Sequence, residues 1–132
     1  MSNSIQIESQ LPAGYQTAMD AMNKRIEAAL GEGFRVIYSA YKEDTKGVPI
    51  DNLEEVAHVG QIVFVDVGRA AFEGNAKGYV GKVLTNPTWL DLCKVANEII
   101  LEANYVDHVY LEGIKPLRTI SNITVAKFYF GS

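Results

Sequence analysis

Apolar residues in the first part of the chain recur at the spacing of an α-helix. From Tyr15 to Leu30 they lie three, four and seven positions apart, along one stripe of a helix with 3.6 residues per turn. Gly31 and Gly33 follow directly, and glycine ends helices because it adopts the left-handed conformation at little cost. The pattern predicts a helix that begins near Ala13 and ends at Leu30.

Short runs of branched and aromatic residues predict strands further along the chain. They occupy 34–41, 61–67 and 79–84. The run at 61–67 is apolar on both faces, which is typical of a central strand. Residues 42–60 have no regular pattern and are predicted as a long loop, and residues 1–11 as a loosely ordered arm.

A second helix and two more strands complete the predicted elements. Asn86 is a favourable N-cap, Pro87 suits the first helical position, and a broad apolar face extends from Trp89 to Ala103. Strands are predicted at 108–113 and 123–130, with a connection that includes 118–122.

These elements predict an α+β protein. We expect an antiparallel sheet of about four to six strands with two main helices packed on one face, in the order α-β-β-β-α-β-β. With 132 residues, the chain is expected to form a single domain over 1–132.

Composition and charge exclude some classes of function. Twelve basic and sixteen acidic residues give a formal net charge of -4, which disfavours a general binder of nucleic acid or of anionic membranes. The start of the chain does not resemble a secretory signal, and no apolar run is long enough for a membrane helix, so a cytoplasmic protein is expected. The single cysteine, Cys93, rules out a disulfide within the chain and is interpreted as a small buried hydrophobe rather than a nucleophile.

The segment 107–112 contains the most suggestive polar cluster. In a strand, His108, Tyr110 and Glu112 would share one face, roughly 7 Å apart. Histidine with a carboxylate can perform acid–base chemistry or bind a ligand, but such residues also form the polar face of ordinary strands. A metal site would require His58 or Asp66 to approach this cluster, and neither a metal nor a cofactor is predicted.

Asp66 is unusual because it lies inside the most apolar strand. A buried carboxylate needs a partner, and Arg69 is the nearest cation in the sequence. The alternative is a ligand-binding role. The predicted ligand-binding residues are therefore His108, Tyr110, Glu112 and Asp66, with no catalytic residue assigned.

The last strand indicates self-association. Phe128, Tyr129 and Phe130 are consecutive, so both faces of this strand carry aromatic rings, of which only one can face the core. We therefore expect a non-enzymatic binding module that forms a homodimer and has a small-molecule or protein partner. Two alternatives stay open: a small acid–base enzyme using His108 with Glu112 or Asp66, and a structural subunit of a larger assembly.

Overall fold

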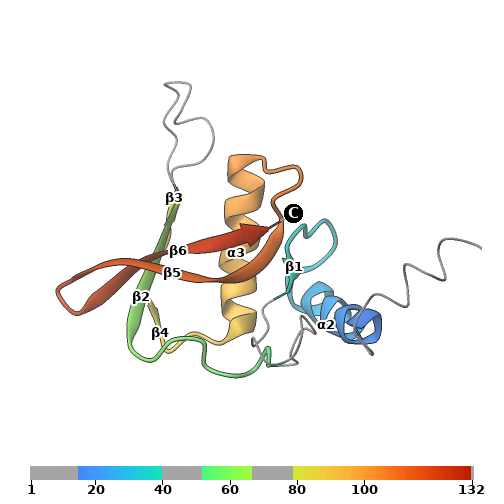
Figure 1. Ribbon diagram of the computed structural model, residues 1–132, viewed down its shortest axis with the longest axis horizontal. Coiled ribbons are helices and arrows are strands. Elements are labelled where there is room, and N and C mark those ends of the chain that lie inside the picture. Colours follow the sequence, from blue (N-terminus) through green and yellow to red (C-terminus); the bar gives the residue numbers. More distant parts are fainter. Residues whose placement is uncertain (1–14, 40–51, 67–78, 132) are drawn as a thin grey trace, which may run out of the picture.

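The computed structural model describes residues 15–39, 52–66 and 79–131, where two helices pack with a six-stranded sheet (Figure 1). This confirms the predicted α+β class. The predicted arm at 1–11, and residues 42–51 of the predicted long loop, lie outside the described residues. The elements, in chain order, are α2 (Tyr15–Leu30), β1 (Ile37–Tyr38), β2 (Gln61–Asp66), β3 (Tyr79–Val80), β4 (Leu84–Thr85), α3 (Trp89–Ala103), β5 (Tyr110–Ile120) and β6 (Ile123–Gly131).

The sheet is mixed rather than purely antiparallel. Its strand order is β1-β5-β6-β2-β3, and β4 also pairs with β2. The β5–β6 pair and the pairs of β2 with β3 and β4 are antiparallel, as predicted, but β1 pairs with β5 and β2 with β6 in parallel. Parallel neighbours need a long crossover, and α3 lies in the chain between the members of both parallel pairs.

The first helix, α2, matches its prediction closely. Met19, Met22 and Ile26 form its buried face, and the helix ends at Leu30. Gly31 follows with a φ of 86° and donates its backbone N–H to the carbonyl of Glu27 at 2.8 Å. Glycine is favoured there because a side chain would be strained at that φ.

The second helix, α3, begins later than predicted. Its N-cap is Thr88, not Asn86: the Thr88 hydroxyl accepts the N–H of Asp91, and the Asp91 carboxylate accepts the N–H of Thr88. This reciprocal capping box satisfies two amide donors that the first turn leaves free. Asn86 instead has a φ of 47°, and its side chain accepts the N–H of Gly60 at 2.6 Å.

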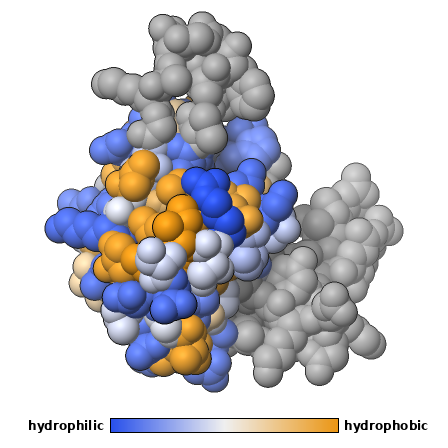
Figure 2. Space-filling view, turned by 90° about the vertical axis from the view of Figure 1, so that its left-hand side faces the viewer, coloured by the Kyte–Doolittle hydropathy of each residue, from blue (hydrophilic) through white to orange (hydrophobic). Residues whose placement is uncertain are grey.

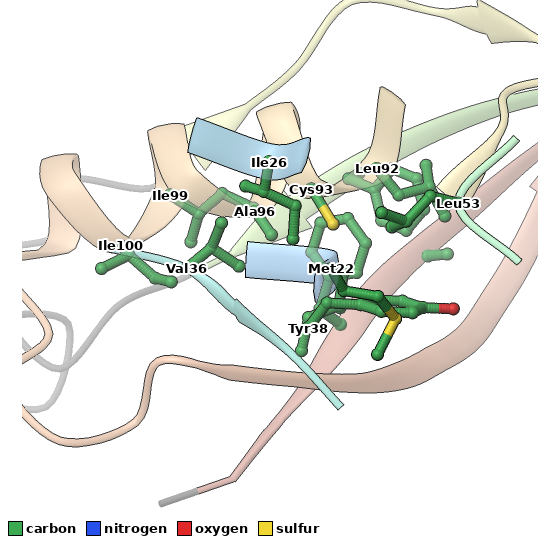
Figure 3. Close-up of a cluster of buried hydrophobic side chains, with 14 of the residues drawn as sticks. Met22, Ile26, Val36, Tyr38, Leu53, Leu92, Cys93, Ala96, Ile99 and Ile100 are labelled. Atoms are coloured by element: carbon green, nitrogen blue, oxygen red, sulfur yellow. The ribbon is translucent and has the colours of Figure 1, made fainter. Parts of the chain in front are cut away.

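One hydrophobic core joins both helices to the sheet (Figure 3). Side chains of α2 and α3 meet Tyr38 and Leu53, and the Tyr38 hydroxyl donates a hydrogen bond to the side-chain oxygen of Asn52. On the strands, Phe64 and Phe128 stack with ring centroids 4.0 Å apart and planes 7° from parallel. The two helices and the inner side of the sheet therefore form a single packed unit.

Two predicted strands are shorter than expected. Of the run at 34–41, β1 contains only Ile37–Tyr38, and the amides of Arg35 and Val36 bond instead to the side-chain oxygen of Asn97 on α3, at 2.7 and 3.1 Å. The predicted strand at 79–84 divides into β3 and β4. A residue between them, Gly81, donates its N–H to the carbonyl of Phe64 at 3.0 Å.

The β5–β6 hairpin is longer than predicted. Strand β5 continues to Ile120, through most of the predicted connection at 118–122, and only Ser121 and Asn122 form the loop. Both loop residues have positive φ, 49° and 66°, as in the tight hairpin turns whose twist matches that of the strands. The end of this hairpin extends beyond the rest of the described sheet (Figure 1).

Candidate functional site

The predicted polar cluster does not form one alternating strand face. His108 lies before β5 and its ring Nδ1 is 3.1 Å from the carboxylate of Asp107, with both side chains exposed. Tyr110 begins β5 and packs against the hydrophobic core. Glu112 lies in a β-bulge, where its carboxylate occupies the space that a Cβ at Gly131 would need. The bulge interrupts the alternation of side chains along β5. Glu112 nevertheless lies near Tyr110, because Gly131 is the direct partner of Tyr110 on β6.

Asp66 has a hydrogen-bond partner that the sequence did not indicate. It lies at the end of β2, and the hydroxyl of Tyr105 is 2.9 and 3.2 Å from its two carboxylate oxygens. The ring of Tyr105 meets Phe130 edge to face, at 5.9 Å between centroids. The predicted partner Arg69 lies outside the described residues. Within the described part of the chain, no hydrogen bond joins Asp66 to His108, Tyr110 or Glu112, and their role in ligand binding stays a prediction.

A second tyrosine–carboxylate pair lies where β3 meets α3. Tyr79 is paired with Asp66 across β2 and β3, and its hydroxyl donates to Glu98 at 2.8 Å. The pKa of Tyr79 is raised well above its ordinary value by burial, by this hydrogen bond and by the charges of Glu98 and Glu102. Two carboxylates of α3 thus produce a negative potential at this point. The pair could not be predicted from the sequence, because Tyr79 and Glu98 lie on different elements.

The opposite side of the sheet is a broad surface that faces away from the core. Ile62 and Phe64 of β2, and Ala126 and Phe128 of β6, are buried on the core side, so the residues alternating with them lie on the other side. Register extends this surface to β5 and β3, because directly paired residues share a face. We call it the outer face; it consists of Val63, Val65, Val80, Lys115, Arg118, Ile120, Ile123, Val125, Lys127 and Tyr129.

The outer face combines exposed apolar and basic side chains. Val80 is 77% exposed, Ile120 52% and Tyr129 51%, and Lys115, Arg118 and Lys127 are exposed as well. No helix of the described residues covers this face, since α3 lies across the core side (Figure 1). Viewed from the hairpin end, apolar residues gather beside strongly hydrophilic ones (Figure 2). Such a surface is typical of a protein interface.

Cations on the outer face are placed unusually close to one another. Lys115 and Lys127 are directly opposite across β5 and β6, and Arg118 pairs with Val125 further along the same hairpin. Like charges directly opposite one another destabilise a sheet. In the described part of the chain, no carboxylate lies within ion-pair distance of these three side chains. This group could not be predicted from the sequence, because its members are separated by up to twelve positions and only the strand register brings them together.

No three His, Cys, Asp or Glu side chains in the described ranges are grouped closely enough to hold a metal ion. Neither described helix is long and apolar enough to cross a membrane. Comparison with the models of known protein families, with curated proteins and with solved structures gives no match.

Proposed function

We propose that the protein is a non-catalytic interaction module that forms homo-oligomers through its outer face. The observation that carries this proposal is the combination, on one sheet face, of exposed apolar side chains with Lys115 and Lys127 in direct opposition. A partner that covers this face would bury apolar area and could also bring carboxylates to the cations. Both effects favour association over the isolated state.

The face is a better candidate than the sheet edges. Strand addition needs a row of free backbone groups on an edge strand. Within the described residues, the edge strands β1, β3 and β4 are each two residues long. The side of β5 beyond Leu111 is also an edge, but Pro116 and two register shifts interrupt its backbone groups. Very short edge strands resist pairing with another chain. Side-chain packing on the outer face therefore accounts for association more readily than backbone pairing.

An acid–base enzyme is less well supported. The histidine–carboxylate contact in the described residues, between His108 and Asp107, is at the exposed surface. Asp66 accepts its hydrogen bond from Tyr105, and Glu112 lies over Gly131. No observation gathers these groups around a position where a substrate would bind, so the enzyme is kept only as the alternative.

The proposal is tested by the mass of the protein in solution. Sedimentation equilibrium at micromolar concentrations and low salt should give a mass well above the 14.5 kDa of one chain. Replacing Tyr129 with serine removes apolar area from the outer face and should weaken association. Val59 is more exposed, at 86%, but lies outside the outer face, so Val59→Ser should behave as wild type. A single 14.5 kDa species at every concentration would refute the proposal.

A further inference from the structure

The charge of the chain is divided unevenly between the β5–β6 hairpin and the remainder. From Tyr110 to Gly131 there are three basic residues, Lys115, Arg118 and Lys127, and one acidic residue, Glu112. The remaining positions therefore hold nine of the twelve basic residues and fifteen of the sixteen acidic ones, which is a formal charge of -6. A hairpin of charge +2 thus belongs to a chain that is otherwise strongly acidic.

This division argues against a symmetric contact through the outer face. In an isologous dimer the same patch of both copies meets at the two-fold axis. The cations of one hairpin would then approach those of the other, in a region where Lys115 and Lys127 already repel each other. Juxtaposed like charges at an interface destabilise it by several kcal/mol. The outer face needs a different, acidic surface as its partner.

Helix α3 carries a surface with complementary properties. Its exposed side chains form a narrow stripe of Lys94, Glu98, Leu101 and Glu102, of which Leu101 is 51% exposed. Lys94 lies at the amino-terminal end of the stripe. The rest of the stripe is acidic with an apolar residue at its centre, Leu101 between Glu98 and Glu102. Glu98 accepts the hydrogen bond of the Tyr79 hydroxyl, and the charges of Glu98 and Glu102 add to burial in raising the pKa of Tyr79. An apolar residue between two carboxylates matches the apolar and basic composition of the outer face.

We propose that the outer face of one copy docks on the Glu98–Leu101–Glu102 stripe of a second copy. This hairpin-to-helix contact rests on the homo-oligomer proposed above and identifies the two surfaces that meet. In it, Lys115, Arg118 and Lys127 approach Glu98 and Glu102, and exposed apolar side chains of the outer face, Ile120 and Tyr129 among them, cover Leu101. Acidic and apolar residues also occur together at 54–59, but there Glu54 already pairs with Arg25.

The two surfaces lie on opposite sides of each copy. Helix α3 packs on the core side of the sheet, and its exposed stripe points away from the sheet. The outer face is on the other side (Figure 1). Each copy can therefore bind one neighbour through its hairpin and another through its helix. Such head-to-tail contacts produce a ring when the rotation closes and a filament when it does not.

A charge-exchange experiment tests the contact. Lys127→Glu reverses one charge on the outer face, and Glu102→Lys reverses one charge on the stripe. Each variant alone should have a dissociation constant at least about ten-fold higher than wild type, because its contact opposes like charges. In an equimolar mixture, the hairpin of each variant can bind the stripe of the other variant, and both of these contacts join opposite charges. The dissociation constant should therefore return to within about three-fold of wild type. The two matched controls, Lys24→Glu and Glu27→Lys on exposed positions of α2, should associate as wild type does.

The outcomes separate this inference from the proposed function. If the wild type is monomeric at all concentrations, both the homo-oligomer and the contact are wrong. If the wild type associates but Lys127→Glu associates equally well, or mixing restores nothing, the contact is wrong and the homo-oligomer stands. Far-UV circular dichroism of each variant shows that it is folded before its mass is interpreted.

A nucleic-acid partner is also distinguished. The probe is a DNA duplex of about 20 base pairs, roughly two turns of the double helix. If wild-type protein binds this duplex at low salt, and Lys127→Glu abolishes binding without any rescue by Glu102→Lys, the outer face is a nucleic-acid surface. That result would overturn the hairpin-to-helix contact.

Discussion

Cys93 shows how burial determines the chemistry of a single residue. Its side chain is fully buried on the apolar face of α3, and the lack of solvation raises the pKa of its thiol from the ordinary 9.0 to about 12. A thiol that stays protonated is a poor nucleophile and a poor metal ligand. The prediction of a buried, hydrophobic cysteine is confirmed.

This pKa makes the stability of the protein depend on pH. The unfolded chain releases the Cys93 proton above its ordinary pKa of 9.0, whereas the folded chain keeps it until about pH 12, so stability falls as pH rises through this range. From about pH 8 to about pH 10, this residue alone should lower the free energy of unfolding by about 1.4 kcal/mol. Urea unfolding at both pH values measures the loss, and Cys93→Ala should show a correspondingly smaller one. Equal losses in the two proteins would mean that the folded thiol ionises normally.

The environment of a single residue could be predicted from the sequence where local periodicity determines it, but not where a distant segment does. Helical periodicity alone places Met22 and Cys93 on buried faces, and both lie there. This partner of Asp66 could not be predicted, because Tyr105 lies 39 positions away, in the connection between α3 and β5. The His108–Glu112 cluster assumed an unbroken strand, but β5 begins only at Tyr110 and bulges at Glu112.

At the scale of elements, the turn and a bulge of the β5–β6 hairpin together determine how the outer face is aligned. Ser121 and Asn122 close β5 on β6 and pair Ile120 with Ile123, and the register shift between Pro116 and Arg118 then places Lys115 opposite Lys127. Both residues are in the left-handed region of φ. Asparagine tolerates this region better than serine because its side chain bonds locally to the backbone.

The turn should therefore be stabilised by a better residue at its first position. We expect Ser121→Asn to raise the free energy of unfolding by about 0.5–1 kcal/mol, because it removes part of the left-handed strain without changing the strands. Denaturant unfolding at equilibrium measures this gain. Ser121→Val is the opposite control and should destabilise, since branched residues are poorly suited to positive φ. A loss of stability in Ser121→Asn would show that the loop has a different conformation.

Local signals predicted the elements better than their pairing. The α2 helix and its glycine stop, the central strand β2 and the extent of the last strand follow from periodicity and turn residues. The start of α3 was misassigned because Asn86 and Thr88 are both good caps, and the contact of Asn86 with Gly60 could not be seen in the sequence. The parallel pairs β1–β5 and β2–β6 join segments far apart in the chain, which local patterns do not determine.

On the scale of the whole molecule, the outer face brings together residues that the sequence separates. The expectation that only one face of the last strand faces the core is confirmed, since Phe128 is buried there and Tyr129 is 51% exposed on the other side. Among the described residues, Glu112 included, no carboxylate forms an ion pair with the three cations of this face. The isolated copy thus retains a repulsion that the proposed contact would relieve.

Salt should consequently act in opposite directions on folding and on association. Raising the salt concentration from about 0.05 M to about 0.5 M screens the repulsion between Lys115 and Lys127 and should stabilise the isolated copy, while it weakens the hairpin-to-helix contact.

The variant Lys127→Gln measures how much of this stabilisation is due to the lysine pair. Its free energy of unfolding should rise on adding salt by about 0.2–1 kcal/mol less than that of wild type. Lys24→Gln, an exposed position on α2, is the matched control and should gain as much as wild type. The measurement is denaturant unfolding followed by the fluorescence of Trp89, at a concentration where sedimentation shows only single chains. An identical gain in wild type and Lys127→Gln would mean that the two lysines do not repel each other in the folded chain, and the like-charge argument for a head-to-tail contact would then lose its basis.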